Sequence, residues 1–276
     1  MPLYRGPTMT VAWSWILVII RSCRRFSRRD MTSVIPARPR KDDGSVEMNR
    51  ERALQSIPYL AKLSVADRDW IIGRGEIRVL ARGERVWDAG NQTTGFAFLV
   101  RGQVKLVKSG ARGREVITEL GRSGDLLCSN AVWMYAPYCC SAVALEDDTE
   151  VVIVPRRDVL EINERSTRAG QVFLEQVINR SMALCRRIDQ LASGQVETRI
   201  ATLFLTLAER GGIDREDGTW LPVPLSRQDL ADLCGTTIET AIRAMSRFGR
   251  DGIVRTTARG FLILDPRKLE RVASPS

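Results

Sequence analysis

Residues 225–264 read LSRQDLADLCGTTIETAIRAMSRFGRDGIVRTTARGFLIL and contain the most regular pattern in this 276-residue chain. Ser226, followed three residues later by Asp229, has the form of a helix N-cap with an acidic third residue. Leu230 and Leu233 then repeat at helical spacing, and Gly235 is a typical helix end. The pattern therefore predicts a short helix that starts beside Ser226 and ends at Gly235.

A second helix and a pair of strands follow directly. Thr236 and Glu239 have the spacing of another capping box, and apolar residues continue at helical spacing as far as Gly249. Apolar runs beginning at Gly252 and Gly260 predict two strands with a basic tip. This order indicates a winged helix-turn-helix, whose second helix enters the DNA major groove. A plain pair of helices with glycine at the turn is the alternative, which the strands and the basic tip disfavour.

The segment resembles the DNA-binding signature of the Crp/Fnr family of bacterial transcription regulators, through Ser226–Ala231, Gly235–Thr240 and Arg243. The resemblance implies phosphate contacts for Arg227, Gln228 and Thr240, and reading of a G·C pair by Glu239 and Arg243. Ile238 replaces the arginine of the cAMP-responsive branch, so the chain is more similar to the Fnr-like branch, and the operator sequence stays open. The residues expected to contact DNA are Arg227, Gln228, Thr237, Glu239, Thr240, Arg243, Arg247, Arg255 and Arg259.

The chain between about residues 50 and 155 predicts short helices followed by strands. Seven or so short runs with β character are separated by glycines, which favours an antiparallel jelly-roll over a βαβ fold. Arg101-Gly102 has the form of a two-residue hairpin turn between the strands 95–100 and 103–107. The resemblance implies the effector-binding β-roll of the same family. We therefore expect an α+β fold, with an N-terminal antiparallel β-roll, a long dimerisation helix and a C-terminal winged helix-turn-helix.

The expected ligand pocket departs from that of the cyclic-nucleotide-binding relatives. Those relatives hold the ribose with a glutamate and the cyclic phosphate with an arginine, whereas the matching positions here are Ser129 and Cys140. A thiol cannot replace the two-pronged guanidinium, so cAMP is not the expected effector. The candidate pocket residues are Cys128, Ser129, Cys139, Cys140 and Ser141.

Histidine and cysteine usage restricts the cofactors. The sequence has no histidine, which excludes His-ligated haem and His-containing zinc sites. Of its six cysteines only Cys23 is near the N-terminus, so an Fe–S cluster of N-terminal cysteines is not expected. Cys128, Cys139 and Cys140 could give a thiol-based redox response, or could be small buried hydrophobes. No certain cofactor follows, and without a phosphate loop or a nucleophile–base pair we expect no enzyme.

A long helical pattern spans about residues 169–193. Apolar residues repeat with the spacing of a coiled-coil seam, which predicts a parallel homodimer. The alternative is one amphipathic helix packed on its own β-roll. The seam residues are Phe173, Val177, Leu184, Ile188 and Leu191.

The first 47 residues differ from the rest. The apolar run Val11–Ile20 is shorter than the roughly 20 residues that a membrane span needs, and its positive charge follows the run instead of preceding it. We expect a disordered extension or a start placed too early, with Met31 or Met48 as the alternative start. No membrane partner is expected.

The sequence therefore predicts four parts, which are an extension (1–47), the β-roll (48–165), the dimerisation helix (166–194) and the winged helix-turn-helix (195–276). The expected function is cytoplasmic transcription regulation by a homodimer on a palindromic operator of double-stranded DNA. An unknown effector or redox signal would control it, and RNA polymerase is an expected partner. A small-molecule-binding module without a DNA role is the alternative. The net charge of +9 suits a polyanionic partner, although much of it lies in the first 50 residues.

Overall fold

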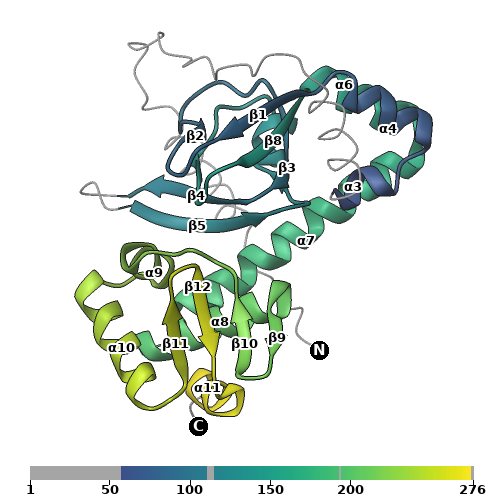
Figure 1. The fold of residues 1–276 in the computed structure, drawn as a ribbon. Helices are drawn as coiled ribbons and strands as arrows, with labels where there is room; N and C mark the ends of the chain where they lie inside the picture. The colour runs from purple at the N-terminus through teal and green to yellow at the C-terminus, as the bar shows by residue number, and fades with distance from the viewer. Residues whose placement is uncertain (1–56, 111–114, 193, 275–276) are drawn as a thin grey trace, which may run out of the picture. The chain divides into compact units, whose positions relative to one another are not determined.

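The structure, a computed structural model, describes residues 57–110, 115–192 and 194–274 (Figure 1). The extension expected at residues 1–47 lies outside these residues. Within the described ranges, no helix combines the length and the apolar character that a membrane span requires.

The helices and strands follow the predicted order, with additions. The strands are β1 (Glu76–Leu80), β2 (Arg85–Trp87), β3 (Gly95–Arg101), β4 (Gln103–Ser109), β5 (Glu115–Arg122), β6 (Leu126–Leu127), β7 (Ser141–Ala144), β8 (Thr149–Pro155), β9 (Ile213–Arg215), β10 (Gly218–Leu221), β11 (Val254–Thr257) and β12 (Gly260–Ile263). The helices are α3 (Pro58–Ala61), α4 (Val65–Ile72), α5 (Ser129–Trp133), α6 (Arg156–Arg165), α7 (Thr167–Ala192), α8 (Val196–Gly211), α9 (Arg227–Cys234), α10 (Ile238–Arg250) and α11 (Pro266–Ala273).

Two four-stranded antiparallel sheets form the β-roll. Their strand orders are β1-β8-β3-β6 and β2-β7-β4-β5. Strand β4 alternates buried and half-buried residues, as a strand with one covered face does, whereas β3 and β8 are buried along nearly their whole length. The expected α+β fold, with an antiparallel β-roll before a winged helix-turn-helix, is confirmed.

The predicted hairpin at Arg101-Gly102 is wrong. Strand β3 pairs with β6 and β8, while β4 pairs with β5 and β7, so the chain passes from one sheet to the other at this turn. Gly102 has a φ of 85° and lies so close to Thr149 that an added Cβ would be 2.6 Å from the Thr149 hydroxyl oxygen. A tight glycine turn is therefore needed, but it serves a sheet crossing, which short-range sequence signals do not distinguish from a hairpin.

Helix α7 packs one face on the β-roll. The ring of Phe173 meets Phe96 edge-on at 5.5 Å and stacks on Trp133 of α5 at 4.8 Å between ring centroids. Tyr59 of α3 contacts the same ring at 6.4 Å. Four aromatic rings from separate elements thereby fix the N-terminal part of α7 against the β-roll core.

The C-terminal part contains the winged helix-turn-helix. Helix α9 begins with the predicted capping box of Ser226 and Asp229 and ends at Gly235 in the left-handed conformation. The N-cap of α10 is Thr237, whose hydroxyl accepts from the Thr240 N–H, so the expectation of Thr236 as N-cap was wrong by one residue. Strands β9 and β10 and helix α11 were not predicted; β9 and β10 extend the β11–β12 pair to a four-stranded sheet.

The β-roll contacts α9 directly. Val107, Ile117 and Leu145 of the β-roll share a hydrophobic cluster with Leu230 and Leu233. The Lys105 ammonium of β4 lies 2.6 Å from a carboxylate oxygen of Asp229, the same side chain that caps α9. Burial would raise the pKa of Asp229, but hydrogen bonds from Lys105 and Ser226 outweigh burial and hold this pKa below its ordinary value.

Replacing Gly102 by alanine should destabilise the fold more than replacing Gly83. Both glycines have a φ of 85°, but a Cβ on Gly83 meets no atom within 4 Å. Gly83→Ala should therefore lower the free energy of unfolding by about 1–2 kcal/mol, the cost of placing alanine in the left-handed conformation. Gly102→Ala should lower it further because of the clash with Thr149. Urea unfolding measures both; equal losses would mean that Thr149 moves aside freely.

Acid should weaken the fold partly through Asp229. Because its folded pKa is depressed, the ionised carboxylate stabilises the protein above the unfolded pKa of about 3.9, and this contribution is lost as the pH falls through the folded pKa. Asp229→Asn should flatten the fall of the urea midpoint with decreasing pH. Asp232→Asn is the control and should have the opposite effect. Because burial raises the pKa of Asp232, removal of this carboxyl group should make the urea midpoint fall more steeply with decreasing pH.

Candidate functional site

Helix α10 combines a buried apolar face with an exposed polar face. Ala241, Ala244, Met245 and Phe248 are buried in the winged helix-turn-helix core. On the other face Glu239, Arg243 and Arg247 are exposed, as the sequence predicted for these positions. The helix is thus fixed by its apolar side while its charged side remains free to meet a ligand as large as DNA.

Short side-chain contacts order the start of this exposed face. The Arg243 guanidinium donates to the Thr240 hydroxyl at 3.1 Å, and the hydroxyls of Thr237 and Thr240 are also 3.1 Å apart. Hydrogen bonds from its own backbone N–H and from Thr237 hold the pKa of Glu239 below its ordinary value. Glu239 is therefore a carboxylate that can only accept hydrogen bonds.

Basic side chains flank α10 on both sides. Arg227, the first residue of α9, donates to the Thr256 hydroxyl of β11 at 2.8 Å, which ties α9 to the strand pair. Arg255 pairs with Asp217 at 2.5 Å, and Arg247 pairs with Asp251 at 3.7 Å. Arg259 is exposed at the tip between β11 and β12.

Gln228 is the remaining residue of the expected DNA-binding set. It is exposed on α9, and its amide donates to Asp232 at 2.8 Å. All nine residues of the set therefore lie on α9, on α10 with its N-cap, or on the β11–β12 pair.

The predicted dimer seam on α7 needs correction. Phe173 is 6% exposed and Val177 packs against the β-roll core, so both belong to the interior of one chain. The predicted seam is therefore contradicted at its first two positions only. Leu184 and Ile188 are exposed, and the side chain of Leu191 lies outside the described part of the chain.

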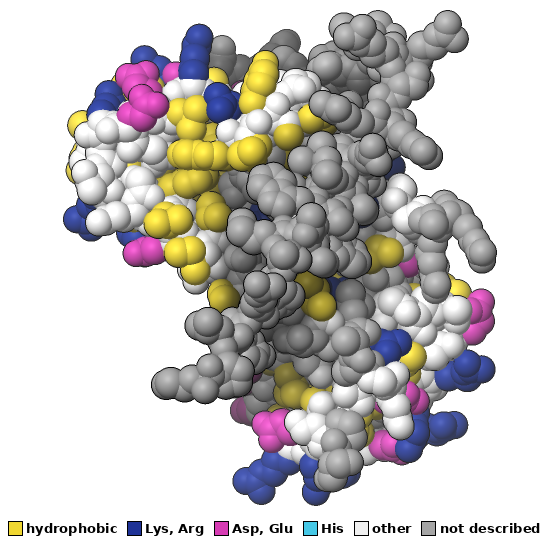
Figure 2. Space-filling view, turned by 180° about the vertical axis from the view of Figure 1, so that it is seen from behind, with side chains coloured by type: hydrophobic (Ala, Val, Ile, Leu, Met, Phe, Trp, Pro, Cys, Tyr) yellow, Lys and Arg dark blue, Asp and Glu magenta, His cyan; other side chains and the backbone are white. Residues whose placement is uncertain are grey.

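A second apolar stripe of α7 is exposed, and it shares Ile188 with the predicted seam. It consists of Leu174, Ile178, Met182 and Ile188, of which more than half of each side chain is accessible. Hydrophobic side chains gather in a band on the described part of the face seen in Figure 2. Large exposed apolar residues that repeat along one helix are typical of a contact with another helix.

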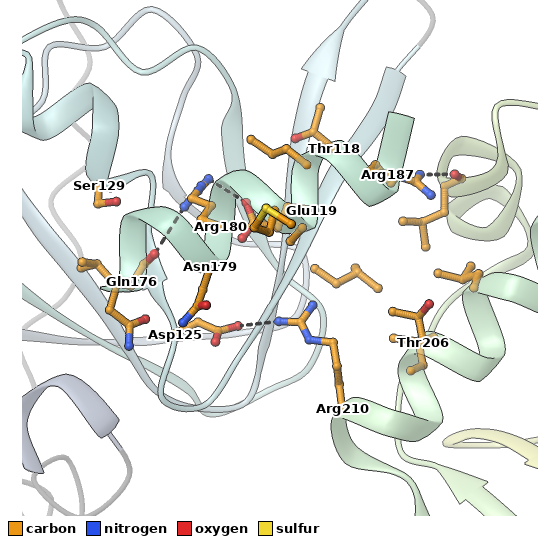
Figure 3. Close-up of a pocket in the computed structure, with 18 residues that line it drawn as sticks. Thr118, Glu119, Asp125, Ser129, Gln176, Asn179, Arg180, Arg187, Thr206 and Arg210 are labelled. Atoms are coloured by element: carbon orange, nitrogen blue, oxygen red, sulfur yellow. Dashed lines mark hydrogen bonds and ion pairs between the residues drawn. The ribbon is translucent and has the colours of Figure 1, made fainter. Parts of the chain in front are cut away.

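A cavity of about 460 Å³ lies between β5, α7 and α8. Figure 3 shows Arg180 of α7 and Arg210 of α8 directed at carboxylates of the β-roll. Arg180 is 2.6 Å from Glu119, and Arg210 is 3.6 Å from Asp125. Ser129, a predicted pocket residue, lines the same cavity.

The arginines that line this cavity were not identified from the sequence. Arg180 and Arg187 lie on α7, whose pattern was interpreted only through its apolar residues, and Arg210 lies on α8. The carboxylates that pair with Arg180 and Arg210 are Glu119 and Asp125 of the β-roll, far away in the sequence. A charged residue on the β-roll side of a predicted amphipathic helix was the available signal. The guanidinium groups that line the cavity therefore come from α7 and α8.

Cys128, Cys139 and Cys140 are brought together. Their sulfur atoms all lie within 4.8 Å of one another, and the Sγ atoms of Cys128 and Cys140 are 3.4 Å apart. Cys128 and Cys140 are buried, and Cys139 is exposed. Hydrogen bonds among the three groups lower the pKa of Cys139 and raise those of Cys128 and Cys140.

Ser141, the fifth predicted pocket residue, has a local role. Its hydroxyl accepts from the Ala89 N–H at 3.0 Å, which joins β7 to the loop after β2. The predicted pocket is therefore divided into a cysteine cluster, a cavity that includes Ser129, and a structural serine.

Two family models match the chain. A model of the Crp-like helix-turn-helix domain matches residues 198–272, and a model of the cyclic nucleotide-binding domain matches residues 77–166. The nitrogen fixation regulation protein FixK of Bradyrhizobium diazoefficiens is 27% identical over 200 residues, covering 70% of this chain and 79% of FixK. The CRP-like cAMP-activated global transcriptional regulator of Mycobacterium tuberculosis is 27% identical over 198 residues, covering 70% of this chain and 85% of the regulator.

Solved structures share the fold. The structure of FixK2 from Bradyrhizobium japonicum has a TM-score of 0.65 at 20% identity, covering 73% of this chain and 98% of FixK2. The c-di-GMP responsive global regulator CLP of Xanthomonas campestris has a TM-score of 0.62 at 18% identity, covering 73% of this chain and 100% of CLP. With a β-roll and a winged helix-turn-helix that both match, the chain belongs to the Crp/Fnr family of DNA-binding transcription regulators.

Proposed function

We propose that this regulator binds a two-fold symmetric operator as a homodimer, with α10 of each subunit in the major groove of one half-site. The main support for this proposal is the exposed polar face of α10, where Glu239 and Arg243 are one helical turn apart. The opposite, apolar face of the helix is buried. Arginine is the commonest partner of guanine in the major groove, and a carboxylate accepts from the amino group of cytosine. The pair therefore suits one G·C base pair.

The other basic and polar residues of the set contact the DNA backbone in this proposal. Arg227 and Gln228 lie at the start of α9, Arg247 lies near the end of α10, and Arg255 and Arg259 belong to the strand pair. Thr237 and Thr240 are at the N-terminus of α10, where hydroxyl groups and the helix dipole favour phosphate. Such contacts fix the register of the protein without reading sequence.

The exposed stripe of α7 provides the dimer contact. A single helix-turn-helix spans one half-site, and two-fold symmetry doubles the number of contacts. Leu174, Ile178, Met182 and Ile188 stay exposed in the single chain, whereas Phe173 is buried against the β-roll. A second copy of α7 is the partner that best fits it, because isologous pairing buries the same apolar residues on both subunits.

The cavity beside α7 is the place we infer for a small-molecule effector. It borders the dimer helix and the β-roll, so an occupant would contact both. Cyclic AMP is not the effector in this proposal, because Ser129 and Cys140 occupy the positions of its carboxylate and guanidinium anchors. A regulator of this kind works in the cytoplasm, where DNA and RNA polymerase are its partners, and has no catalytic role.

A small-molecule-binding module without a DNA role is the second candidate. The cavity favours it as well, so operator binding is the property that separates the two. Selection of bound fragments from genomic DNA would supply an operator, and failure to enrich any sequence would favour the second candidate.

Arg243→Ala should relax the preference at one base pair of each half-site. Loss of a two-pronged contact to guanine costs about 1–3 kcal/mol of discrimination. Fluorescence anisotropy on the operator and on single-base variants measures this change. Arg227→Ala is the control and should weaken binding to all DNA sequences equally. It should also reduce the slope of log affinity against log salt concentration by about one. Uniform weakening by Arg243→Ala would contradict its assignment to a base.

Ile178→Glu with Leu174→Glu should convert the dimer to a monomer and abolish tight operator binding. Both side chains are exposed in the single chain, at 51% and 57%, so the variant should fold normally. In the dimer each unpaired buried charge would cost several kcal/mol. Analytical ultracentrifugation and operator binding are the measurements, with circular dichroism to verify folding.

Leu184→Glu distinguishes the two possible faces of α7. Leu184 belongs to the face predicted from sequence and lies outside the exposed stripe, so this variant should remain dimeric. If Leu184→Glu dissociates the dimer and the double variant does not, the dimer contact lies on the face predicted from the sequence.

A further inference from the structure

We propose that Cys128, Cys139 and Cys140 form a binding site for a trivalent thiophilic ion of the arsenic and antimony class, held by three sulfur atoms. The three cysteines come from two places in the chain: Cys128 precedes α5, and Cys139 and Cys140 precede β7. A role as small hydrophobic core residues would explain why Cys128 and Cys140 are each buried. It does not account for the convergence of a third, exposed thiol to within 4.8 Å of both.

The spacing fits a single bound ion. A pyramidal ion with bonds to sulfur of about 2.3 Å holds its three sulfur atoms roughly 3.5 Å apart. The Sγ atoms of Cys128 and Cys140 are 3.4 Å apart, and all three sulfur atoms lie within 4.8 Å of one another. Two surrounding features restrain the cluster. Trp87 donates its indole N–H to the Cys140 carbonyl at 2.9 Å, and Cys128 has the uncommon positive φ of 46°. These restraints hold buried sulfur atoms near the positions that three-sulfur coordination requires.

The number of ligands favours a three-coordinate ion. Structural zinc and Fe–S clusters take four protein ligands, and the sequence has no histidine to act as a fourth. Among the residues that the structure describes, no carboxylate joins the three sulfur atoms at ligand distance. Soft thiolates select soft ions, and trivalent arsenic and antimony are satisfied by three sulfur ligands because a lone pair fills the remaining position.

The charge of the complex also favours a trivalent ion. Three bound thiolates carry three negative charges, two of them on buried side chains, and uncompensated buried charge is strongly unfavourable. A divalent ion leaves one negative charge, whereas a trivalent ion gives a neutral complex. Arg180, whose charge acts on Cys128, is already paired with Glu119 at 2.6 Å. The exposed Cys139 provides the entry to the site.

Binding from arsenite needs no oxidant or reductant. The neutral acid As(OH)₃ exchanges three As–O bonds for three As–S bonds, and each thiol proton leaves with a hydroxide as water. One ion, three cysteine sulfurs and three released water molecules balance the exchange, and the arsenic remains trivalent.

The site is placed to act on the dimer helix, an inference that rests on the proposed function. Helix α5 starts directly after Cys128, and its Trp133 stacks on Phe173 of α7. Arg180 of α7 also donates to the Leu126 carbonyl at 3.3 Å, two residues before Cys128. An ion bound at Cys128 would therefore act on groups that contact α7 at two points.

Titration of the reduced full-length protein with arsenite tests the site itself. Native mass spectrometry should show one arsenic per chain, and X-ray absorption should show three sulfur neighbours and no oxygen neighbour. Cys139→Ser should weaken binding by more than about tenfold, because even loss of an outer partner of a metal site commonly costs that much. Cys185→Ser, an exposed cysteine of α7 outside the cluster, should bind as the parent does.

Three results would overturn the proposal. They are absence of arsenite binding, unchanged binding by Cys139→Ser, and tighter binding of Zn²⁺ with a fourth ligand. Cys139 is exposed, so its serine variant should fold, and circular dichroism verifies this.

Operator affinity with and without arsenite is a separate measurement. A change in the parent that Cys139→Ser lacks supports regulation through α7. Binding of arsenic without a change in operator affinity would reject regulation and leave the ion site in place, and failure to bind any operator would reject the proposed function alone.

Discussion

The two-sided packing of α7 is the constraint on which the rest of the molecule depends. Phe173 packs against Tyr59 and Phe96, which are buried in the β-roll core, and the exposed Trp133 stacks on its ring. Because Phe173 is buried on one face of α7, the turn of the helix places Leu174 and Ile178 outside that face, where they are exposed in a single chain. The contact that completes the β-roll thereby also defines the surface proposed for a second subunit.

Local signals in the sequence predicted the winged helix-turn-helix well. The capping box of Ser226 and the end of α9 at Gly235 depend on residues within one turn of each other, so spacing alone identifies them. The error of one residue at the start of α10 has the same origin: Thr236 and Thr237 are adjacent, and both can cap. Only the structure shows which hydroxyl meets the Thr240 N–H.

Features that depend on distant residues were not predictable in the same way. A glycine turn at Gly102 looks alike in a hairpin and in a sheet crossing, and the difference lies in which strands pair later. Apolar spacing on α7 identified a helix with a seam but could not tell which stripe the β-roll would cover. The ion pairs of Arg180 and Arg210 join helices to strands more than fifty residues earlier in the chain, which leaves no local pattern.

The β-roll contacts α9 directly, in addition to the connection through α7 and α8. Asp229 caps the first helix of the DNA-binding unit and also pairs with Lys105 of the β-roll. A movement of β4 that separates this pair would leave a buried carboxylate without its cation and weaken the start of α9, where Arg227 also holds the strand pair through Thr256. The orientation of the residues proposed to meet phosphate is therefore coupled to the β-roll through one buried side chain.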